Sequence, residues 1–138
     1  MVMERRLVDT LSLDNGLTLK LYDGSRKIAA DRWQVACIAN VAVPVDFPDP
    51  EMLSRAGMTR NDISEALGDP VLFEKVLERN FVDASDLKPV TDGLFQSVVD
   101  SLVPYLSRPD FPGRFLIRKY QEYRQQTVWR KKDDLFFA

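Results

Sequence analysis

The sequence has 138 residues, of which 45% are hydrophobic and 29% are charged, and its net charge is −2. This length fits one domain, and the apolar content excludes a disordered chain, so we expect residues 1–138 to form a single domain. The single cysteine excludes a disulfide scaffold. The absence of histidine excludes Ser-His-Asp and Cys-His catalysis and histidine-containing metal sites.

The charge is distributed unevenly along the chain. Residues 1–107 contain 11 basic and 17 acidic residues, whereas residues 108–132 contain 8 basic and 2 acidic residues. A basic segment on an acidic body is able to bind nucleic acid or phosphate, and it is equally able to dock on the acidic body itself.

No segment of the sequence has the pattern of a signal peptide or a membrane span. The longest apolar stretch, 35–45, is shorter than the ~20 residues that a span requires. We therefore expect a cytoplasmic protein with no membrane segment, and a lone cysteine fits a reducing compartment.

Alternation of leucine with polar residues predicts antiparallel strands in the first third of the chain. The runs 7–13 and 17–22 flank Asn15 and Gly16, a pair that favours a hairpin turn because both residues accept positive φ. Asp9 falls on the leucine-facing side, and we interpret it as a strand-start or bulge position near solvent. A third strand is expected over about 32–45, with Cys37 on its core face as an inert buried thiol.

The rest of the sequence predicts helices. Proline interrupts residues 46–50. Short helical segments are expected at 51–56 and from Thr59 or Asn61 to Gly68. Asp69 and Pro70 have the pattern of an N-cap followed by a first helical position, which predicts a helix to about Asn80. Apolar residues at helical spacing predict longer helices over about 88–107 and 112–129.

Strands followed by helices indicate the α+β class. We expect an N-terminal three-stranded antiparallel meander over 1–45, followed by a helical half over 46–138 with three to five helices packed on one face of the sheet. An uncovered edge strand or a helix pair would support a homodimer.

One candidate binding site is the polar loop after the second strand. Its cations and backbone donors suit a phosphate or a carboxylate, and the alternative is a solvated hairpin loop. Trp33 either packs under the helices or lines a groove with Tyr22. The candidate ligand- or partner-binding residues are Asp23, Ser25, Arg26, Lys27, Arg32 and Trp33.

A second candidate surface is the basic C-terminal segment, where cations are interleaved with aromatic rings. Cations would meet phosphates and rings would stack on unpaired bases, although the acidic pI of about 5.2 disfavours a dedicated nucleic-acid binder. The candidate nucleic-acid-binding residues are Arg118, Arg124, Trp129, Arg130 and Lys131.

These patterns favour a cytoplasmic, non-catalytic interaction module that binds a protein partner or a small ligand, without cofactor or metal. One alternative is a nucleic-acid-binding accessory protein that uses the basic C-terminal helix. The other is a small enzyme that uses Asp and Lys in acid–base chemistry. The enzyme would need a pocket holding at least two of Asp23, Lys27, Asp31 and Arg32.

Overall fold

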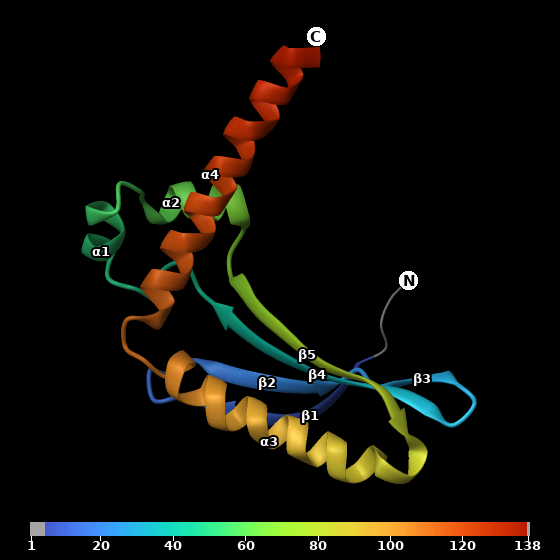
Figure 1. Ribbon diagram of the computed structural model, residues 1–138. Coiled ribbons are helices and arrows are strands. Elements are labelled where there is room, and N and C mark those ends of the chain that lie inside the picture. The colour runs from blue at the N-terminus through green and yellow to red at the C-terminus, as the bar shows by residue number, and fades with distance from the viewer. Residues whose placement is uncertain (1–4, 138) are drawn as a thin grey trace. The chain divides into compact units, whose positions relative to one another are not determined.

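The structure, a computed structural model, describes the backbone of residues 5–137 and the side chains of residues 5–129 (Figure 1). Its elements are β1 (Arg6–Ser12), β2 (Thr18–Asp23), β3 (Arg26–Ala29), β4 (Arg32–Val43), α1 (Pro50–Arg55), α2 (Arg60–Leu67), β5 (Val71–Asp83), the 3-10 turn η1 (Ala84–Asp86), α3 (Leu87–Leu106) and α4 (Phe111–Phe137). An antiparallel sheet combined with helices confirms the α+β class. The sheet has five strands rather than the expected three, because β3 and β5 add to it.

The chain folds into two compact units, each built from two separate stretches. The first unit comprises Met1–Ala42 and Leu72–Pro109, and the second comprises Val43–Val71 and Asp110–Ala138. The first unit contains nearly all of the sheet and α3, whereas the second contains α1, α2 and α4. The expectation of a single domain stays a prediction.

The hairpin expected around Asn15 and Gly16 is confirmed. β1 and β2 pair antiparallel, and Gly16 has a φ of 92°, a left-handed conformation that glycine adopts without a Cβ penalty. The Asn15 Oδ1 accepts a hydrogen bond from the Leu17 N–H, and its Nδ2 donates to the carbonyls of Leu106 (2.7 Å) and Arg108 (3.0 Å). The last carbonyls of a helix have no partner within it, so the hairpin turn caps the end of α3.

The segment after Asp23 is a break between two strands rather than a loop. β2 and β3 both pair with β4, and the turn at Ala30 separates β3 from β4. At the break, the Gly24 N–H donates to the Ala36 carbonyl, and the Ala36 N–H donates to Ser25 Oγ at 3.1 Å. The serine hydroxyl therefore takes the place of a backbone carbonyl, and the ladder continues across the break.

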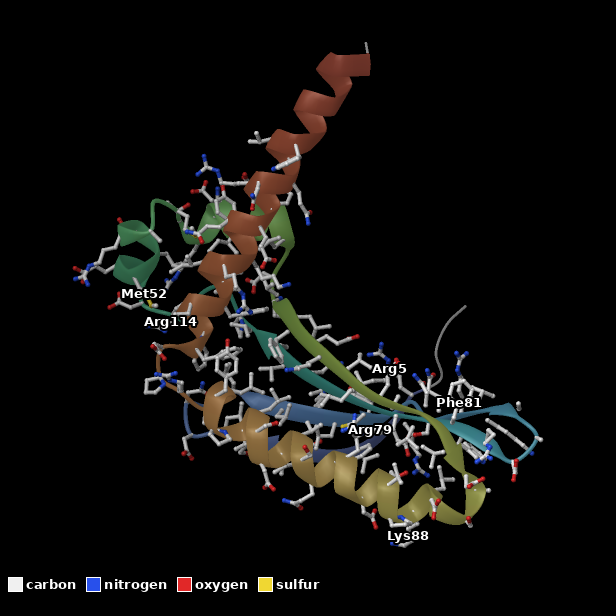
Figure 2. All side chains as sticks on the ribbon, viewed as in Figure 1. Arg5, Met52, Arg79, Phe81, Lys88 and Arg114 are labelled. Carbon is white, nitrogen blue, oxygen red and sulfur yellow. The ribbon has the colours of Figure 1, made fainter. Side chains whose placement is uncertain are left out.

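The central strand β4 is covered on both faces over part of its length. Residues 35–39 are all fully buried, and successive residues of a strand point to opposite faces. α3 lies along the face that carries Leu21 (Figure 1). On the other face, the Arg5 guanidinium lies 6.0 Å from the Tyr22 ring centroid and bonds Glu74 of β5 (Figure 2).

The helix expected over 69–80 is wrong, because this segment forms β5. The Asp69 side chain does not cap a helix. Instead, it accepts a hydrogen bond from the Val45 N–H at 3.0 Å. Buried Val71 and Phe73 alternate with exposed neighbours, which is the two-residue period of a strand. Pairing with β4 therefore overrides a local helical signal.

α3 confirms the long helix expected over about 88–107. Four of its residues are buried at four-residue intervals, which places them on one stripe: Leu94, Val98, Leu102 and Leu106. Complete burial of a leucine or valine side chain stabilises the folded state by roughly 1.5–3 kcal/mol relative to leaving it exposed. This stripe is the main contribution of α3 to the core of the first unit.

In the second unit, the two short helices are confirmed and both have N-terminal caps. The Asp49 side chain accepts from the Glu51 N–H, and Thr59 forms a capping box with Asp62. α4 contacts both short helices and is longer than expected, since it runs to Phe137. A Cβ on Gly113 would collide with the flexible thioether end of Met52 (Figure 2), so glycine leaves room for this side chain beside α4.

We expect Asn15→Ala to lower the free energy of unfolding by about 1–2 kcal/mol, because the substitution leaves two carbonyls at the end of α3 without their donor. Urea denaturation measures this loss. Asp14→Ala is the matched control, since Asp14 is the exposed neighbour in the same turn. Equal stability of the two variants would show that the cap contributes nothing.

Candidate functional site

A groove of about 450 Å³ lies in the first unit, between the β1–β2 hairpin and α3. This volume is in the range of small-ligand and peptide side-chain sites. β1 and β2 supply one wall, and two turns of α3 supply the other. The lining residues are Arg6, Val8, Asp9, Leu21, Asp23, Thr91, Asp92, Phe95, Gln96 and Val99.

A β-bulge in β1 shapes the strand wall of this groove. Leu7 lies opposite Tyr22, whereas Asp9 lies opposite Leu21, so Val8 is the extra residue between the two pairs. Regular alternation would point Val8 and Asp9 to opposite faces, but with the bulge both line the groove. The interpretation of Asp9 as a bulge position near solvent is confirmed, since its side chain is exposed.

The floor of the groove is apolar and its rim is acidic. Val8, Leu21, Phe95 and Val99 give the apolar surface. Three carboxylates and one guanidinium lie around them, which gives the groove a formal charge of −2. The charged residues are Asp9, Asp23, Asp92 and Arg6.

The three carboxylates differ in their partners. Asp23 lies 3.8 Å from Arg6, and Asp92 pairs with Lys88 at 3.0 Å one turn earlier on α3. Asp9 accepts a hydrogen bond from the Thr10 N–H at 2.8 Å, and among the described side chains it has no cationic partner. Asp9 is therefore the carboxylate best placed to take a cation from a ligand.

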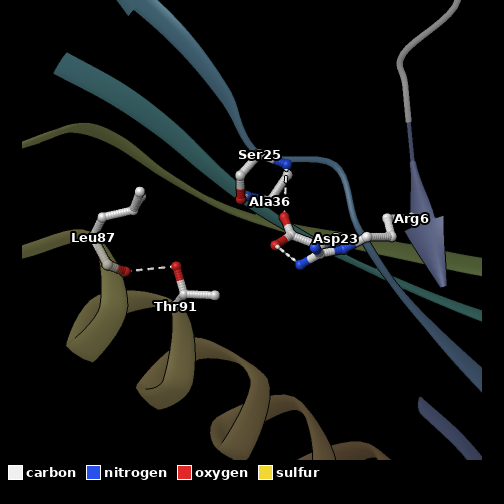
Figure 3. Close-up of polar contacts among 6 residues, drawn as sticks. All are labelled: Arg6, Asp23, Ser25, Ala36, Leu87 and Thr91. Carbon is white, nitrogen blue, oxygen red and sulfur yellow. Dashed lines mark hydrogen bonds and ion pairs between the residues drawn. The ribbon is translucent and has the colours of Figure 1, made fainter. Parts of the chain in front are cut away.

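Polar side chains on both walls are held by local bonds. Figure 3 shows Asp23, which accepts from the Ser25 N–H at 2.8 Å, and Thr91, whose hydroxyl donates to the Leu87 carbonyl at 2.6 Å. Gln96 donates to Asp100 at 2.9 Å. These bonds fix the rim side chains before any ligand arrives.

The structure distributes the candidate loop residues over different places. Of the six, Asp23 lines the groove. Ser25, together with Arg5, Arg6 and Asp23, lines an adjacent shallow depression, and its hydroxyl already accepts the Ala36 N–H. The carboxylate and the serine are therefore largely used to close the break between β2 and β3.

The cations of the same set have structural partners or point elsewhere. Arg26 donates to Gln34 across the β3–β4 pair, and Arg32 forms an ion pair with Asp83 at the end of β5. Lys27 lies opposite Trp33. These three cations and Trp33 are not among the residues that line the groove. Asp31 is not among them either, so Asp23 is the one member of the proposed enzyme set that lies there.

Trp33 does not share a groove with Tyr22. Tyr22 lies opposite Ile38 of β4, so both side chains point to the same face of the sheet. Trp33 is separated from Ile38 by an odd number of positions along β4, so it points to the other face. Trp33 is half-buried beside the β3 strand. This placement disagrees with the alternative in which Trp33 lines a groove with Tyr22.

Sequence reasoning missed the helical wall of the groove. Asp92, Phe95 and Val99 lie on α3, and nothing in their local pattern distinguishes them from an ordinary helix surface. One signal was present in the sequence: the placement of Asp9 on a leucine-facing side of a strand.

The single thiol is buried on the face of the sheet that carries the groove. Cys37 is fully buried and lies opposite Asp23 in the β2–β4 pair. Burial, and to a smaller extent the negative charge of Asp23, raises the pKa of Cys37 to about 11 from an ordinary 9.0. A protonated, buried thiol is a poor nucleophile, which agrees with its interpretation as inert.

The basic C-terminal segment lies on α4. Arg118 and Lys119 both approach Glu122, at 4.0 Å and 3.6 Å. Arg124 and Trp129 are exposed, and the side chains of Arg130 and Lys131 lie outside the described residues.

No family model matches the chain, and neither curated proteins nor solved structures give a significant match. Within the described part of the chain, no group of three or more His, Cys, Asp or Glu residues is placed to hold a metal ion. The described helices include none with the length and apolarity needed to cross a bilayer.

At pH 8 we expect the native protein to react with a chromogenic disulfide reagent far more slowly than the denatured chain, because the Cys37 thiol is buried and protonated. The colour change over time measures the rate. Complete labelling of the native protein within seconds would contradict the buried placement.

Between pH 9 and pH 11 the same thiol should lower the free energy of unfolding. The Cys37 thiol loses its proton near pH 9.0 in the unfolded chain and near pH 11 in the folded chain. The stability that the buried, protonated thiol contributes is therefore intact below pH 9 and is lost as the pH rises to 11. Urea denaturation over this range should show a steeper decline for the wild type than for Cys37→Ala. Parallel declines would contradict the raised pKa.

Proposed function

We propose that the protein is a non-catalytic interaction module, and that it binds an extended, basic segment of a partner protein at the edge of its sheet. The observation that carries the proposal is the groove between the edge strand β1 and α3, with its apolar floor and acidic rim. A cytoplasmic location is part of the proposal, because the single free thiol fits a reducing compartment.

The backbone of β1 supports strand addition. β1 is the end strand of the sheet and has β2 as its one partner among the described strands, so the N–H and C=O groups of its outer edge have no strand partner. An extended peptide that adds to such an edge gains backbone hydrogen bonds, and its alternate side chains enter the adjoining groove. The bulge at Val8 limits regular pairing to the half of β1 that follows it.

The lining of the groove supports selection of basic side chains. Lysine and arginine have apolar stems and charged ends, so the stem would lie on Phe95 and Val99 while the cation meets Asp9 and Asp92. Hydrogen bonds between ionised partners are stronger than neutral ones. A peptide with arginine at alternate positions matches the two-residue period of an added strand.

We expect an acetylated and amidated peptide of sequence TRVRT to bind the full chain, and its acidic twin TEVET not to bind, because the groove carries a net negative charge. Isothermal titration calorimetry measures both affinities. The double variant Asp9→Asn with Asp92→Asn should bind TRVRT roughly tenfold more weakly, which corresponds to about 1.4 kcal/mol.

The matched control is Asp14→Asn with Asp86→Asn, which removes the same charge from exposed positions that do not line the groove. Hydrogen exchange provides the second readout, since strand addition should protect β1 amides. Tight binding of free arginine amide without β1 protection would indicate a small-ligand site instead. Equal weakening by both double variants would refute a specific groove.

A further inference from the structure

In the second half of α4, the side chains that the structure describes are largely exposed. Residues 111–113, 115 and 116 are buried, whereas residues 121–126, 128 and 129 are exposed, and Trp129 is 63% exposed. The backbone nevertheless stays helical to Phe137. A helix without packing partners is marginally stable in water, so this length of helix is suited to contact another molecule.

The charge of this segment indicates a polyanionic partner. α4 contains seven basic residues and three acidic residues, of which Asp133 and Asp134 lie near its end and Glu122 lies in its middle. That carboxylate is shared by Arg118 and Lys119, and Arg124 has no ion pair among the described side chains. Arg114 pairs with Asp110 at 3.0 Å, and the helix as a whole keeps a formal charge of +4.

The arrangement of apolar residues disfavours pairing with a second copy of α4. A coiled coil needs its apolar residues on one seam. At about 100° per residue, Tyr123 and Val128 point about 140° apart, and Trp129 points about 100° further round. Among the side chains described up to residue 129, the exposed apolar ones thus form no seam, and the basic positions of α4 likewise surround the helix.

From these observations we propose that the second half of α4 binds duplex DNA by lying in the major groove. A helix with its side chains is about 10–12 Å across, and the major groove is about 12 Å wide, so cations on opposite sides of the helix reach both phosphate backbones. The major groove of duplex RNA is too narrow for this fit. This binding is independent of the peptide groove, which lies on other residues.

The test is fluorescence anisotropy of a labelled DNA duplex about two helical turns long, titrated with the full chain at about 50 and about 200 mM salt. We expect binding that weakens steeply with salt. The triple variant Arg124→Gln, Arg130→Gln and Lys131→Gln should bind at least roughly tenfold more weakly. The slope of its log binding constant against log salt concentration should be smaller in magnitude by about three.

The matched control is Lys20→Gln, Lys27→Gln and Lys75→Gln, which removes the same charge from exposed strand positions and should keep wild-type affinity and slope. Circular dichroism verifies that both triple variants fold. Equal weakening in both variants would overturn the proposal, as would tighter binding to single-stranded DNA or to duplex RNA of the same length. A chain that binds only anionic lipid vesicles, or that dimerises without binding DNA, would also overturn it.

Discussion

The pairing of β4 along both of its edges is the constraint on which the first unit depends. β2 and β3 follow one another along one edge, and β5 occupies the other. The middle residues of β4 are all buried, so water cannot reach their backbone groups. Each of these N–H and C=O groups therefore needs a hydrogen-bond partner in the protein. The Ser25 hydroxyl meets this need at the one place where the neighbouring strand is interrupted.

The candidate site arises where regular pairing fails. An unbroken β1 would point Val8 and Asp9 to opposite faces, and the groove would lose part of its floor or part of its rim. The bulge places both on the side of α3. The same irregularity disturbs the edge of the sheet, which reduces unwanted pairing between copies while leaving the later half of β1 available.

Local patterns were sufficient for elements that local chemistry determines. Asn15 and Gly16 predict their hairpin, Thr59 and Gly68 bound α2, and the four-residue spacing from Leu94 to Leu106 predicts α3. β5 could not be predicted in this way, because Asp69 serves Val45 rather than a helix and the strand is stabilised by β4. The groove was only partly predictable, since its α3 wall meets β1 through tertiary packing.

The Asn15 cap has a consequence for synthesis of the chain on the ribosome. The carbonyl that Asn15 binds belongs to a residue 91 positions later. At ~5–20 residues per second, the hairpin waits on the order of 5–20 s for its partner, and β4 waits for β5 during part of that interval. A nascent chain that stalls before α3 therefore carries strands whose apolar face still lacks its helix, and such surfaces promote aggregation.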